Sequence, residues 1–572
     1  MKNRMIAEMF EKIADVLEYQ GEIAFKVNAY RKAARVIRDM QEDIEEVWRE
    51  GRLTEIPGIG KALATKIDEY LTTGNMTKYE EVVGSVPAGL IELLEIQNLG
   101  PKTVALANKE LGVESLADLK RVIADGSLAQ LPGMGQKKVE NILKGIELYE
   151  KAQERISIGV ALPLVEEIIG QLKEKTGLDT ITHAGSVRRM KETVGDIDIL
   201  VQTDQGAQVI QQFVHLPQVT RILAAGDTKG SVIVEDRIQI DLRAIRRESF
   251  GAALQYFTGS KAHNIHLREI AKKAGLKINE YGVFRGEEKI AGETEEEVYG
   301  SLNLAWIPPE MREDRGEIEL AARRQLPQLI ELNDIRGDLH VHSKWSDGGA
   351  TIEEVVRAAS ARGYAYIAIC DHSKSVKYAR GLEEERVWQK VEEIREVQKK
   401  FPHIKILAGT EVDILADGSL DYSDELLAQL DIVVAAVHQG FKQQVTERLL
   451  SAMENPNVLI IAHPTGRLIS KREGYEMKIE KVLKKAAETG TVLEINSYYD
   501  RLDLSDVNAR RAKEMGVKLA IDTDTHQLYQ LDMIKLGVGV ARRAWLKAED
   551  VVNTWPLEKL LALRDAKRKK QG

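Results

Sequence analysis

Hydrophobic residues in the first 155 positions recur at spacings of three and four, and glycine turns interrupt them. This spacing predicts short amphipathic helices, beginning with MKNRMIAEMFEKIADVLEY. From about residue 156 the pattern is mixed, and it predicts one helix over 162–175 and β-branched strands near 181–182, 196–201, 232–234 and 238–242. Residues 246–316 are predicted to be mostly helical with a short hairpin, and they end at WIPPEMRE, where paired prolines interrupt any element.

The last third of the chain shows a different alternation. Residues 317–334, EIELAARRQLPQLIELND, are predicted to form a charged helical linker. After them come six short apolar strands, each ending in a polar or ionisable residue: YIAICDH, IKILAGTEVD, DIVVAAVH, VLIIAHP, TVLEINS and KLAIDTDTH. Strands that alternate with helices predict a parallel α/β barrel-like domain, in which reactive groups collect at the carboxyl ends of the strands.

Composition narrows the class of protein. A chain of 572 residues is too long for one core, so three or more domains are expected. No run of about 18 apolar residues predicts a membrane span, and the N-terminus lacks the apolar block of a signal peptide. The single cysteine, Cys370, excludes an intrachain disulfide and fits a reducing cytoplasm.

The net charge of −9 does not favour binding to nucleic acid. It does not exclude it either, because carboxylates that bind metal count as negative before their cations arrive. Binding also needs only a local basic face.

Three segments share one pattern, two short helices joined by a glycine turn: IPGIGKALATKI (56–67), NLGPKTVALANKEL (98–111) and LPGMGQKKVENI (131–142). Such a turn leaves backbone N–H groups at a helix N-terminus, where they suit a phosphate and ignore base identity. One copy alone would be read as an ordinary helix corner. Three copies, each followed closely by lysine, resemble helix-hairpin-helix motifs and predict binding to a DNA backbone through Gly58, Gly60, Lys61, Gly100, Lys102, Gly133 and Gly135.

A candidate phosphoryl-transfer site lies in GSVRRMKETVGDIDIL (185–200). Asp196 and Asp198 share one face of a strand, and Asp241 lies in the neighbouring strand pattern RIQIDLRAI. Phosphoryl transfer needs cations that hold the phosphates in line, and hard carboxylate ligands favour Mg²⁺. A lone D-x-D would more simply be a solvated strand edge, but the upstream Gly-Ser turn, the arginines and the third Asp favour a two-metal site.

These motifs together resemble family X DNA polymerases, similar to DNA polymerase beta. The resemblance runs over roughly residues 5–316 and includes, in family order, NAYRKAARVI, IPGIGKALATKIDEYLTTG, GSVRR, GDIDIL, IDLRAI, QYFTGSKAHNIHLR and INEYGVF. It implies a nucleotidyltransferase-type palm with two Mg²⁺ ions on Asp196, Asp198 and Asp241, where Asp241 helps to deprotonate the primer 3′-hydroxyl. It also implies nucleotide contacts from Gly185, Ser186, Arg189, Gly195, Tyr256, Phe257, Gly259, Asn264 and Arg268.

Two departures from the family pattern are visible. The family usually has arginine two residues before the third Asp, whereas this chain has Gln239, which leaves the tuning of Asp241 open. The resemblance places the 5′-phosphate pocket on Lys26 and Tyr30 and the lyase lysine on Lys66. One familial pocket lysine is Ala62 here, with Lys61 adjacent, so a lyase and a plain DNA-facing charge remain equal alternatives for Lys66.

The stretch RGDLHVHSKWSDG (336–348) starts a second cluster of ligand types. Nine His and acidic residues lie mostly at the ends of predicted strands, and they include six of the 11 histidines: His340, His342, Asp347, His372, Glu411, His438, His463, Asp524 and His526. Core packing does not explain such clustering. His403 lies outside the set and is interpreted as a core residue, and Cys370 as a buried strand residue.

The pattern DLHVHS, SDG, DH, E, H, AHP, DTH closely resembles the polymerase and histidinol phosphatase (PHP) domain over about residues 336–565. The resemblance implies a distorted (β/α)7 barrel with three metals. The first would be held by His340, His342, Glu411 and Asp524, the second by Glu411, His438 and His463, and the third by Asp347, His372 and His526. Mixed imidazole and carboxylate ligands suit Mn²⁺ or Zn²⁺ better than Mg²⁺.

The combined prediction is a multidomain α+β and α/β protein. Its predicted segments are 1–80 (lyase-like helix-hairpin-helix), 81–155 (DNA-binding helix-hairpin-helix), 156–245 (palm), 246–316 (nucleotide-selecting), 317–334 (linker) and 335–572 (PHP). The resemblance implies a cytoplasmic, monomeric DNA polymerase that fills short gaps in nicked or gapped duplex DNA from deoxynucleoside triphosphates during base excision repair. It also implies a 3′–5′ exonuclease and an abasic-site endonuclease. The alternatives are a small-molecule phosphatase on a DNA-binding scaffold and a non-catalytic repair adaptor.

Overall fold

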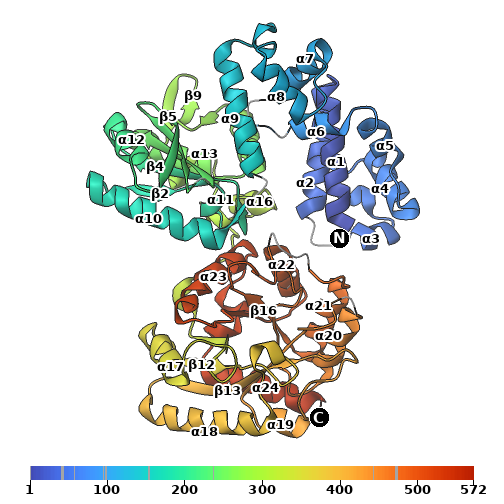
Figure 1. Cartoon of the computed structure of the whole chain (residues 1–572), viewed down its shortest axis with the longest axis vertical. Helices are drawn as coiled ribbons and strands as arrows, with labels where there is room; N and C mark the ends of the chain where they lie inside the picture. Colours follow the sequence, from blue (N-terminus) through green and yellow to red (C-terminus); the bar gives the residue numbers. More distant parts are fainter. Residues whose placement is uncertain are drawn as a thin grey trace. The chain divides into compact units, whose positions relative to one another are not determined.

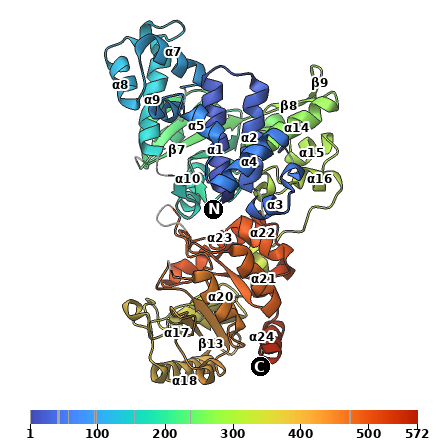
Figure 2. The same cartoon turned by 90° about the vertical axis from the view of Figure 1, so that its right-hand side faces the viewer.

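The computed structural model describes residues 2–39, 44–56, 58–94, 96, 99–152, 155–235, 237–441, 443–469 and 474–571. The side chains of residues 2–4, 8, 35, 38, 39, 88, 91, 102, 144 and 147–152 are not described. The chain divides into two compact units, 1–154 and 155–572 (Figures 1 and 2).

The first unit is helical. Its helices are α1 (Lys2–Tyr19), α2 (Ala24–Asp39), α3 (Ile44–Arg49), α4 (Lys61–Thr73), α5 (Thr77–Val83), α6 (Ala88–Leu94), α7 (Pro101–Leu111), α8 (Leu116–Ala124) and α9 (Gln136–Ala152). The spacing of apolar residues explains them, because Ile6, Phe10, Ile13 and Leu17 form one buried stripe on α1. One core joins α1–α5 and a second joins α6–α9.

The three predicted hairpins have a common geometry. Gly60 and Gly100 are the N-caps of α4 and α7, and no side chain caps either helix. Gly135 accepts the first backbone hydrogen bonds of α9 in the same way. Gly58 and Gly133 have φ of +89° and +73°, a left-handed conformation that glycine adopts without strain. The first-turn N–H groups at these glycines are therefore not blocked by a capping side chain.

The second unit begins with a five-stranded sheet in the order β2-β4-β7-β6-β5. Its elements are β1 (Ile156–Ser157), α10 (Ile158–Thr176), β2 (Ile181–His183), α11 (Gly185–Arg188), β3 (Thr193–Val194), β4 (Asp196–Gln202), α12 (Gly206–Val214), β5 (Val219–Ala225), β6 (Lys229–Val234) and β7 (Ile238–Ile245). The four predicted strands are confirmed, and β5 is an additional one. Ile197, Ile199 and Val201 pack with α10 and α12, whereas Leu200 packs on the other face with Phe250 of α13 (Phe250–Thr258).

A helical region with a small antiparallel sheet follows. It contains α13, α14 (Lys261–Lys273), β8 (Lys277–Asn279), β9 (Gly282–Arg285), β10 (Glu288–Ala291), α15 (Glu295–Ser301) and α16 (Glu317–Ala322). The predicted charged linker 317–334 is helical only over α16 and the short 3-10 helix η5 (Leu332–Asp334). Glu317 of α16 is fully buried. Its burial is compensated, because its carboxylate contacts His263 Nδ1 at 2.6 Å and accepts the backbone N–H groups of Asp314 and Arg315.

The C-terminal region is a barrel of seven parallel strands in sequence order. The strands are β11 (Gly337–Val341), β12 (Tyr366–Ile369), β13 (Lys405–Asp413), β14 (Ile432–Ala436), β15 (Ile460–Ile461), β16 (Val492–Asn496) and β17 (Leu519–Asp522). The helices are α17 (Ile352–Ala361), α18 (Glu384–Lys400), α19 (Asp424–Leu427), α20 (Val445–Glu454), α21 (Ile479–Thr489), α22 (Asp506–Glu514), α23 (Ile534–Arg543) and α24 (Leu557–Gln571). Val341 and Thr525 form a parallel bridge beside β17, so the first and last strands meet and the predicted barrel is confirmed.

The two ends of the barrel differ in character. At the amino ends of the strands, the Tyr366 hydroxyl bonds the backbone carbonyls of Val552, Asn553 and Trp555, and this segment shares an apolar core with α24. The carboxyl ends carry the histidines and acids described below. One end is therefore a packed plug and the other holds the polar chemistry.

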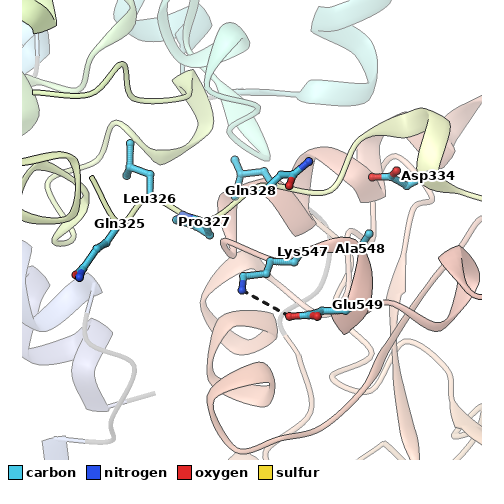
Figure 3. Close-up of a pocket in the computed structure, with 9 residues that line it drawn as sticks. Gln325, Leu326, Pro327, Gln328, Asp334, Lys547, Ala548 and Glu549 are labelled. Carbon is cyan, nitrogen blue, oxygen red and sulfur yellow. Dashed lines mark ion pairs between the residues drawn. The ribbon is translucent and has the colours of Figure 1, made fainter. Parts of the chain in front are cut away.

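The segment between α16 and β11 lines a surface pocket of about 610 Å³ together with Lys547, Ala548 and Glu549 (Figure 3). None of the predicted site residues lines this pocket. Among the described helices, none is long and apolar enough to cross a membrane.

Candidate active sites

The three predicted carboxylates meet on neighbouring strands of the five-stranded sheet. β4 and β7 are parallel, and their register places Asp198 directly beside Asp241. Asp196 lies two residues earlier on the same face of β4 because side chains alternate along a strand. The sheet thus brings Asp196, Asp198 and Asp241 together, as the sequence predicted.

Mutual repulsion marks this triad as a cation site. Burial, and then the carboxylates of Asp196 and Asp241, raise the pKa of Asp198 to about 7. Burial and then Asp241 also raise the pKa of Asp196. Bound cations of Mg²⁺ type would favour the ionised forms of Asp196 and Asp198, whose pKa values are raised.

Asp241 has partners that sequence reasoning missed. Lys229 Nζ of the adjacent strand β6 lies 2.6 Å from Asp241 Oδ2, and Gln239 Nε2 donates to Oδ1 at 2.9 Å. Burial alone would raise the pKa of Asp241, but hydrogen bonds from Lys229, Gln239 and Ser231 outweigh it and lower the pKa. The lysine therefore supplies the positive charge that the familial arginine, replaced by Gln239, would bring. Ser231 is the residue of β6 that pairs with Asp241, and Lys229 lies two positions before it on the same face of the strand. This lysine in the strand pattern was the signal that could have identified the partner of Asp241.

The arginines of the GSVRR segment bind the helical region after the five-stranded sheet. Arg188 forms two hydrogen bonds with Glu295, at 2.7 and 2.8 Å, and a third with the Thr258 hydroxyl. Arg189 donates to the Thr258 carbonyl at 2.7 Å and to Glu313 at 3.0 Å. The charge of Arg189 opposes the raised pKa of Asp196, but burial and Asp241 outweigh it.

Other predicted nucleotide contacts gather near the same turn. A Cβ on Gly185 would lie 2.7 Å from Asp198 Oδ2, so a glycine is required where this carboxylate approaches the backbone. Asn264 Nδ2 donates to the carbonyls of Tyr256 and Gly259, and this holds the turn that carries Tyr256 and Phe257. Among the remaining predicted contacts, Ser186 is partly buried, whereas Gly195 and Arg268 are exposed.

The second site is centred on Glu411, which is fully buried at the carboxyl-end half of β13. Its carboxylate lies within 3.6 Å of ring nitrogens of His340, His342, His372, His438 and His463. These histidines come from four strand ends, because His340 and His342 both lie at the end of β11. A single carboxylate between five imidazoles has the position of a bridging ligand, as the resemblance implied.

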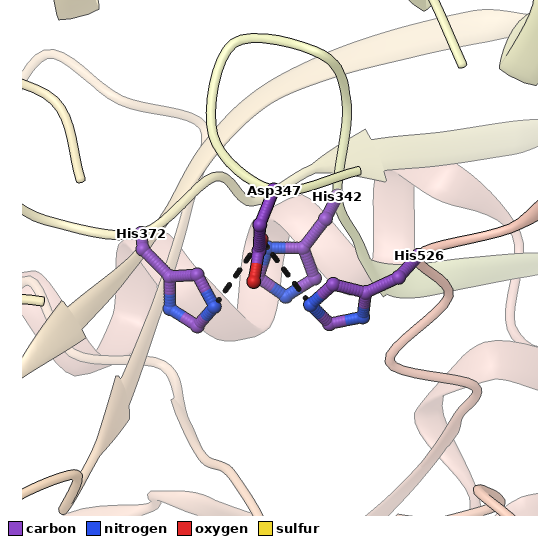
Figure 4. A group of neighbouring side chains, drawn as sticks. All are labelled: His342, Asp347, His372 and His526. Carbon is purple, nitrogen blue, oxygen red and sulfur yellow. Dashed lines mark ion pairs between the residues drawn. The ribbon is translucent and has the colours of Figure 1, made fainter. Parts of the chain in front are cut away.

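Two further groups of potential ligands adjoin Glu411. His340, His342 and Asp524 form one, with the two Nε2 atoms 3.2 Å apart and Asp524 Oδ1 3.1 Å from His342. His342, Asp347, His372 and His526 form the other, and Figure 4 shows the imidazoles turned toward Asp347. Ligands of one ion lie roughly 3 Å apart, so both groups have suitable spacing. The structure brings all nine predicted residues together, although the groups differ from the predicted sets. His342 and His372 each belong to two groups, and His372 joins Glu411 and His438 where His463 was expected. His463 Nε2 lies 3.1 Å from Glu411.

The buried nitrogens of this cluster fit metal ions. Nδ1 of His342 and Nδ1 of His463 are buried without a hydrogen-bond partner among the described residues. Burial lowers the pKa of each of these rings to about 4, which keeps them neutral, the form that binds metal. Asp524 and His463 also have positive φ angles of 54° and 29°, conformations that persist where surrounding contacts enforce them.

A supporting layer of acids lies beneath the ligands, and sequence reasoning did not single it out. Glu494 accepts a hydrogen bond from His340 Nδ1 at 2.7 Å and another from the backbone of His463 at 2.6 Å. Asp413 accepts the backbone N–H of His438 at 3.0 Å. Asp371 holds the loop before Asp347 through Ser343 and Ser346. Such partners orient imidazoles for metal binding. The signal was an acid inside an otherwise apolar strand, as in TVLEINS.

The residues of the predicted 5′-phosphate pocket differ in their surroundings from what the sequence suggested. Burial lowers the pKa of Lys66, and the charges of Lys78 and Lys26 lower it further, whereas Lys61 is not among the causes. Tyr30 is only 5% exposed and packs edge-to-face on Phe10, so little of its ring is accessible. The side chain of Lys102, a predicted DNA contact, lies outside the described residues.

Two minor predictions can be compared with the structure. Cys370 is fully buried, and burial raises the pKa of its thiol to about 12, which agrees with an inert core residue. The interpretation of His403 as a core residue is wrong. His403 is exposed, and its Nε2 lies 2.6 Å from the Ser360 hydroxyl.

Several segments match known families. Residues 1–76 match a helix-hairpin-helix domain, 90–147 a SAM-like helix-hairpin-helix tandem, 253–313 the DNA polymerase beta thumb, and 338–498 the PHP domain. A relative from Bacillus subtilis (strain 168), named DNA polymerase/3′-5′ exonuclease PolX, is 41% identical over 568 residues, which cover 98% of each chain.

Other relatives match one part of the chain. DNA polymerase lambda of Arabidopsis thaliana is 28% identical over 347 residues, 54% of this chain and 62% of the plant protein. A protein of Thermoanaerobacter sp. (strain X514), named a probable phosphatase, is 32% identical over 250 residues, 41% of this chain and 97% of that protein.

Proposed function

The chain belongs to the family X DNA polymerases that carry a PHP domain, and on that premise we propose a DNA-directed DNA polymerase with a 3′–5′ exonuclease in its C-terminal barrel. The observation that carries the proposal is the presence of two complete and chemically different sites in one chain. Asp196, Asp198 and Asp241 provide only oxygen ligands, whereas the barrel provides six imidazoles and three carboxylates.

In the polymerase site, the residues of this chain position charge. Two Mg²⁺ ions bound to the triad would neutralise the phosphates and activate the attacking hydroxyl. Lys229 and Gln239 keep Asp241 ionised, so it can accept a proton from the primer 3′-hydroxyl. We assign Arg189, which donates to the Thr258 carbonyl, to the triphosphate, and Tyr256, whose carbonyl Asn264 holds, to the sugar.

In the barrel, Mn²⁺ or Zn²⁺ would provide a hydroxide near neutral pH and stabilise the leaving oxygen. Glu411 holds the centre of the cluster, and Glu494 fixes the ring orientation of His340. The expected product is a deoxynucleoside monophosphate released from a DNA 3′ end. The same chemistry could cut beside an abasic site.

We extend the proposal to DNA repair. Two helix-hairpin-helix regions would bind the backbone of gapped or nicked duplex DNA through their glycine turns, and the enzyme would fill short gaps in base excision repair as a monomer. In a bacterium this DNA lies in the cytoplasm. The six segments predicted from the sequence are our proposed domains, with Lys66 as the proposed lyase nucleophile of the first.

The test separates the two activities on one 5′-labelled gapped duplex. Asp196→Ala with Asp198→Ala should abolish extension with Mg²⁺ and dNTPs but leave shortening with Mn²⁺ intact. His340→Ala with His342→Ala should do the reverse. Asp204→Ala in the palm and His403→Ala in the barrel change exposed residues outside both sites and serve as matched controls. Loss of both activities in either folded double variant would contradict two independent sites.

A small-molecule phosphatase remains the second candidate, because the barrel also resembles a protein named a probable phosphatase. A duplex labelled with ³²P in its 3′-terminal internucleotide phosphate distinguishes the two. Release of labelled nucleotide supports the exonuclease, whereas the phosphatase would remove only free phosphate from a 3′-phosphorylated end.

A further inference from the structure

Exposed tyrosines are concentrated near the mouth of the barrel site. Tyr378 lies on the short helix η6 (Lys377–Ala379) that follows His372, and Tyr529 lies on η7 (Leu528–Met533), which follows His526. They are 75% and 66% exposed. Both loops leave the carboxyl ends of strands that carry metal-type ligands, so both rings belong to the same end of the barrel as the cluster.

Electrostatic contacts relate these rings to the cluster. Partial burial of its hydroxyl raises the pKa of Tyr378, and the carboxylates of Glu411, Asp413 and Asp347 raise it further. Tyr498, in the loop after β16, has its pKa raised to about 12, mainly by burial and also by Tyr529 and Asp524. These electrostatic effects agree with the position of η6 and η7, which follow His372 and His526 at the carboxyl end of the barrel.

A partly exposed cation, Arg501, adjoins the ligand Asp524. Arg501 Nε is 3.7 Å from Asp524 Oδ2, and the side chain remains 22% exposed. Burial opposes the charge on Arg501, but Asp524 and Glu411 outweigh it and raise its pKa. Its backbone N–H donates to the Tyr498 carbonyl, which ties the arginine to the same loop as that ring.

This arrangement suits a nucleotide more than a small phosphate ester. An exposed tyrosine ring is available for stacking, and every nucleobase has a π-face that can stack on it. A guanidinium beside a metal cluster can contact a phosphate oxygen through two N–H groups. A small phosphomonoester would use the metals and the arginine but would leave the rings uncovered.

We propose that Tyr378 and Tyr529 form a stacking subsite for the unpaired 3′-terminal nucleotides of single-stranded DNA, and that Arg501 contacts the phosphate to be cleaved. This inference rests on the proposed exonuclease function and deepens it. The barrel then acts on frayed or single-stranded 3′ ends, because a base stacked in a duplex cannot also stack on these rings.

Binding without metal gives the first test. A single-stranded oligonucleotide with 2-aminopurine at its 3′ end, mixed with the full chain in EDTA, should lose fluorescence as the base stacks. Tyr378→Leu and Tyr529→Leu should each raise the apparent Kd from this quenching titration by about tenfold, the scale of one lost base–aromatic stack. Tyr378→Phe and Tyr529→Phe keep the aromatic ring and should leave the apparent Kd unchanged. Trp388→Leu removes an exposed ring from the outer helix α18 and is the matched control.

Hydrolysis gives the second test. With Mn²⁺ present, an oligonucleotide whose 3′-terminal residue is abasic should be cut about tenfold more slowly than the intact one by the unaltered chain. In Tyr378→Leu with Tyr529→Leu, removal of the base should make no further difference. An equal penalty in both proteins would overturn the stacking subsite. If the unaltered chain cuts no DNA end at all, the proposed exonuclease itself fails, which is a separate outcome.

Discussion

Arg543, at the end of α23 in the C-terminal barrel, donates a hydrogen bond to Glu313 at 3.0 Å, and Glu313 also accepts one from Arg189 of the palm. Arg543 also donates to the Arg189 backbone carbonyl at 2.8 Å and pairs with Asp506 at 2.9 Å. The pKa values of Glu313 and Asp506 are held well below the ordinary range, because Arg543 outweighs the effect of burial. A buried ionic network thus joins the barrel to a predicted nucleotide contact.

Arg543→Met should destabilise the second unit and weaken nucleotide binding. It leaves two buried carboxylates without their main partner, which costs about 3–5 kcal/mol in urea unfolding. The KM for dNTP should rise several-fold because Arg189 loses its support, whereas Arg543→Lys should lie in between. Lys535→Met breaks an exposed pair with Glu166 and should cost no more than about 1 kcal/mol. Equal effects of the Arg543 and Lys535 substitutions would contradict a structural role for the network.

Lys229→Met should slow DNA synthesis by at least about tenfold at neutral pH, because Asp241 loses the charge that keeps it ionised. Since Lys229 lowers the pKa of Asp241, its loss raises that pKa and moves the acidic limb of the pH–rate profile to higher pH. Adding Gln239→Arg to this variant places the familial arginine beside Asp241 and should restore activity. Lys173→Met, at an exposed position on α10, is the control. A profile that does not move would show that Lys229 has no part in tuning Asp241.

The two sites should differ in metal preference after chelation. Mg²⁺ alone should restore synthesis because its ligands are carboxylates, whereas shortening of 3′ ends should respond most to Mn²⁺. The comparison uses demetallated enzyme, one labelled primer, and the double variants described above to assign each activity. Equal stimulation of both reactions by Mg²⁺ would argue against imidazole-rich ligation in the barrel.

Lys66 should form a Schiff base with an incised abasic duplex, which borohydride would trap covalently. A lysine amine attacks an aldehyde only when neutral, and burial followed by Lys78 lowers the pKa of Lys66. Lys66→Ala should abolish trapping, and Lys78→Met should shift its pH dependence to higher pH because the lowering charge is gone. Lys61→Ala should have a smaller effect, since Lys61 is exposed. Unchanged trapping in Lys66→Ala would show that Lys66 is not the nucleophile and only binds the DNA backbone.

Glu295 should make stability depend on pH in the acidic range. Arg312 and Arg188 overcome its burial and lower its pKa to about 2 from 4.5. Its contribution is complete above pH 4.5 and is lost as pH falls toward 2, because the unfolded chain then binds the proton more readily. The difference in Tm between the unaltered chain and Glu295→Gln should therefore narrow as pH falls below 4.5. A difference that stays constant over this range would contradict the lowered pKa.

Much of the architecture was predictable from local patterns. Apolar spacing predicted the helices of the first unit, and apolar strands with polar ends predicted the barrel and the end that carries its chemistry. Period-two alternation placed His340 with His342 and Asp196 with Asp198, because a strand presents every second side chain to the same face. The helix expected over 317–334 ends at Ala322, because Arg324 has a positive φ of 60° and Pro327 lacks a backbone N–H.

The sequence by itself determined which residue types are present and which face of each strand they occupy, because those follow from short-range periodicity. Tertiary structure decided which distant groups meet. Glu494 supports His340 across 154 positions, and Arg543 reaches Glu313 across 230. Lys229 stands beside Asp241 because β6 and β7 pair in one antiparallel register, and Gln239 alone did not reveal this substitute. Such pairings depend on the order and packing of strands and helices, which no local spacing encodes.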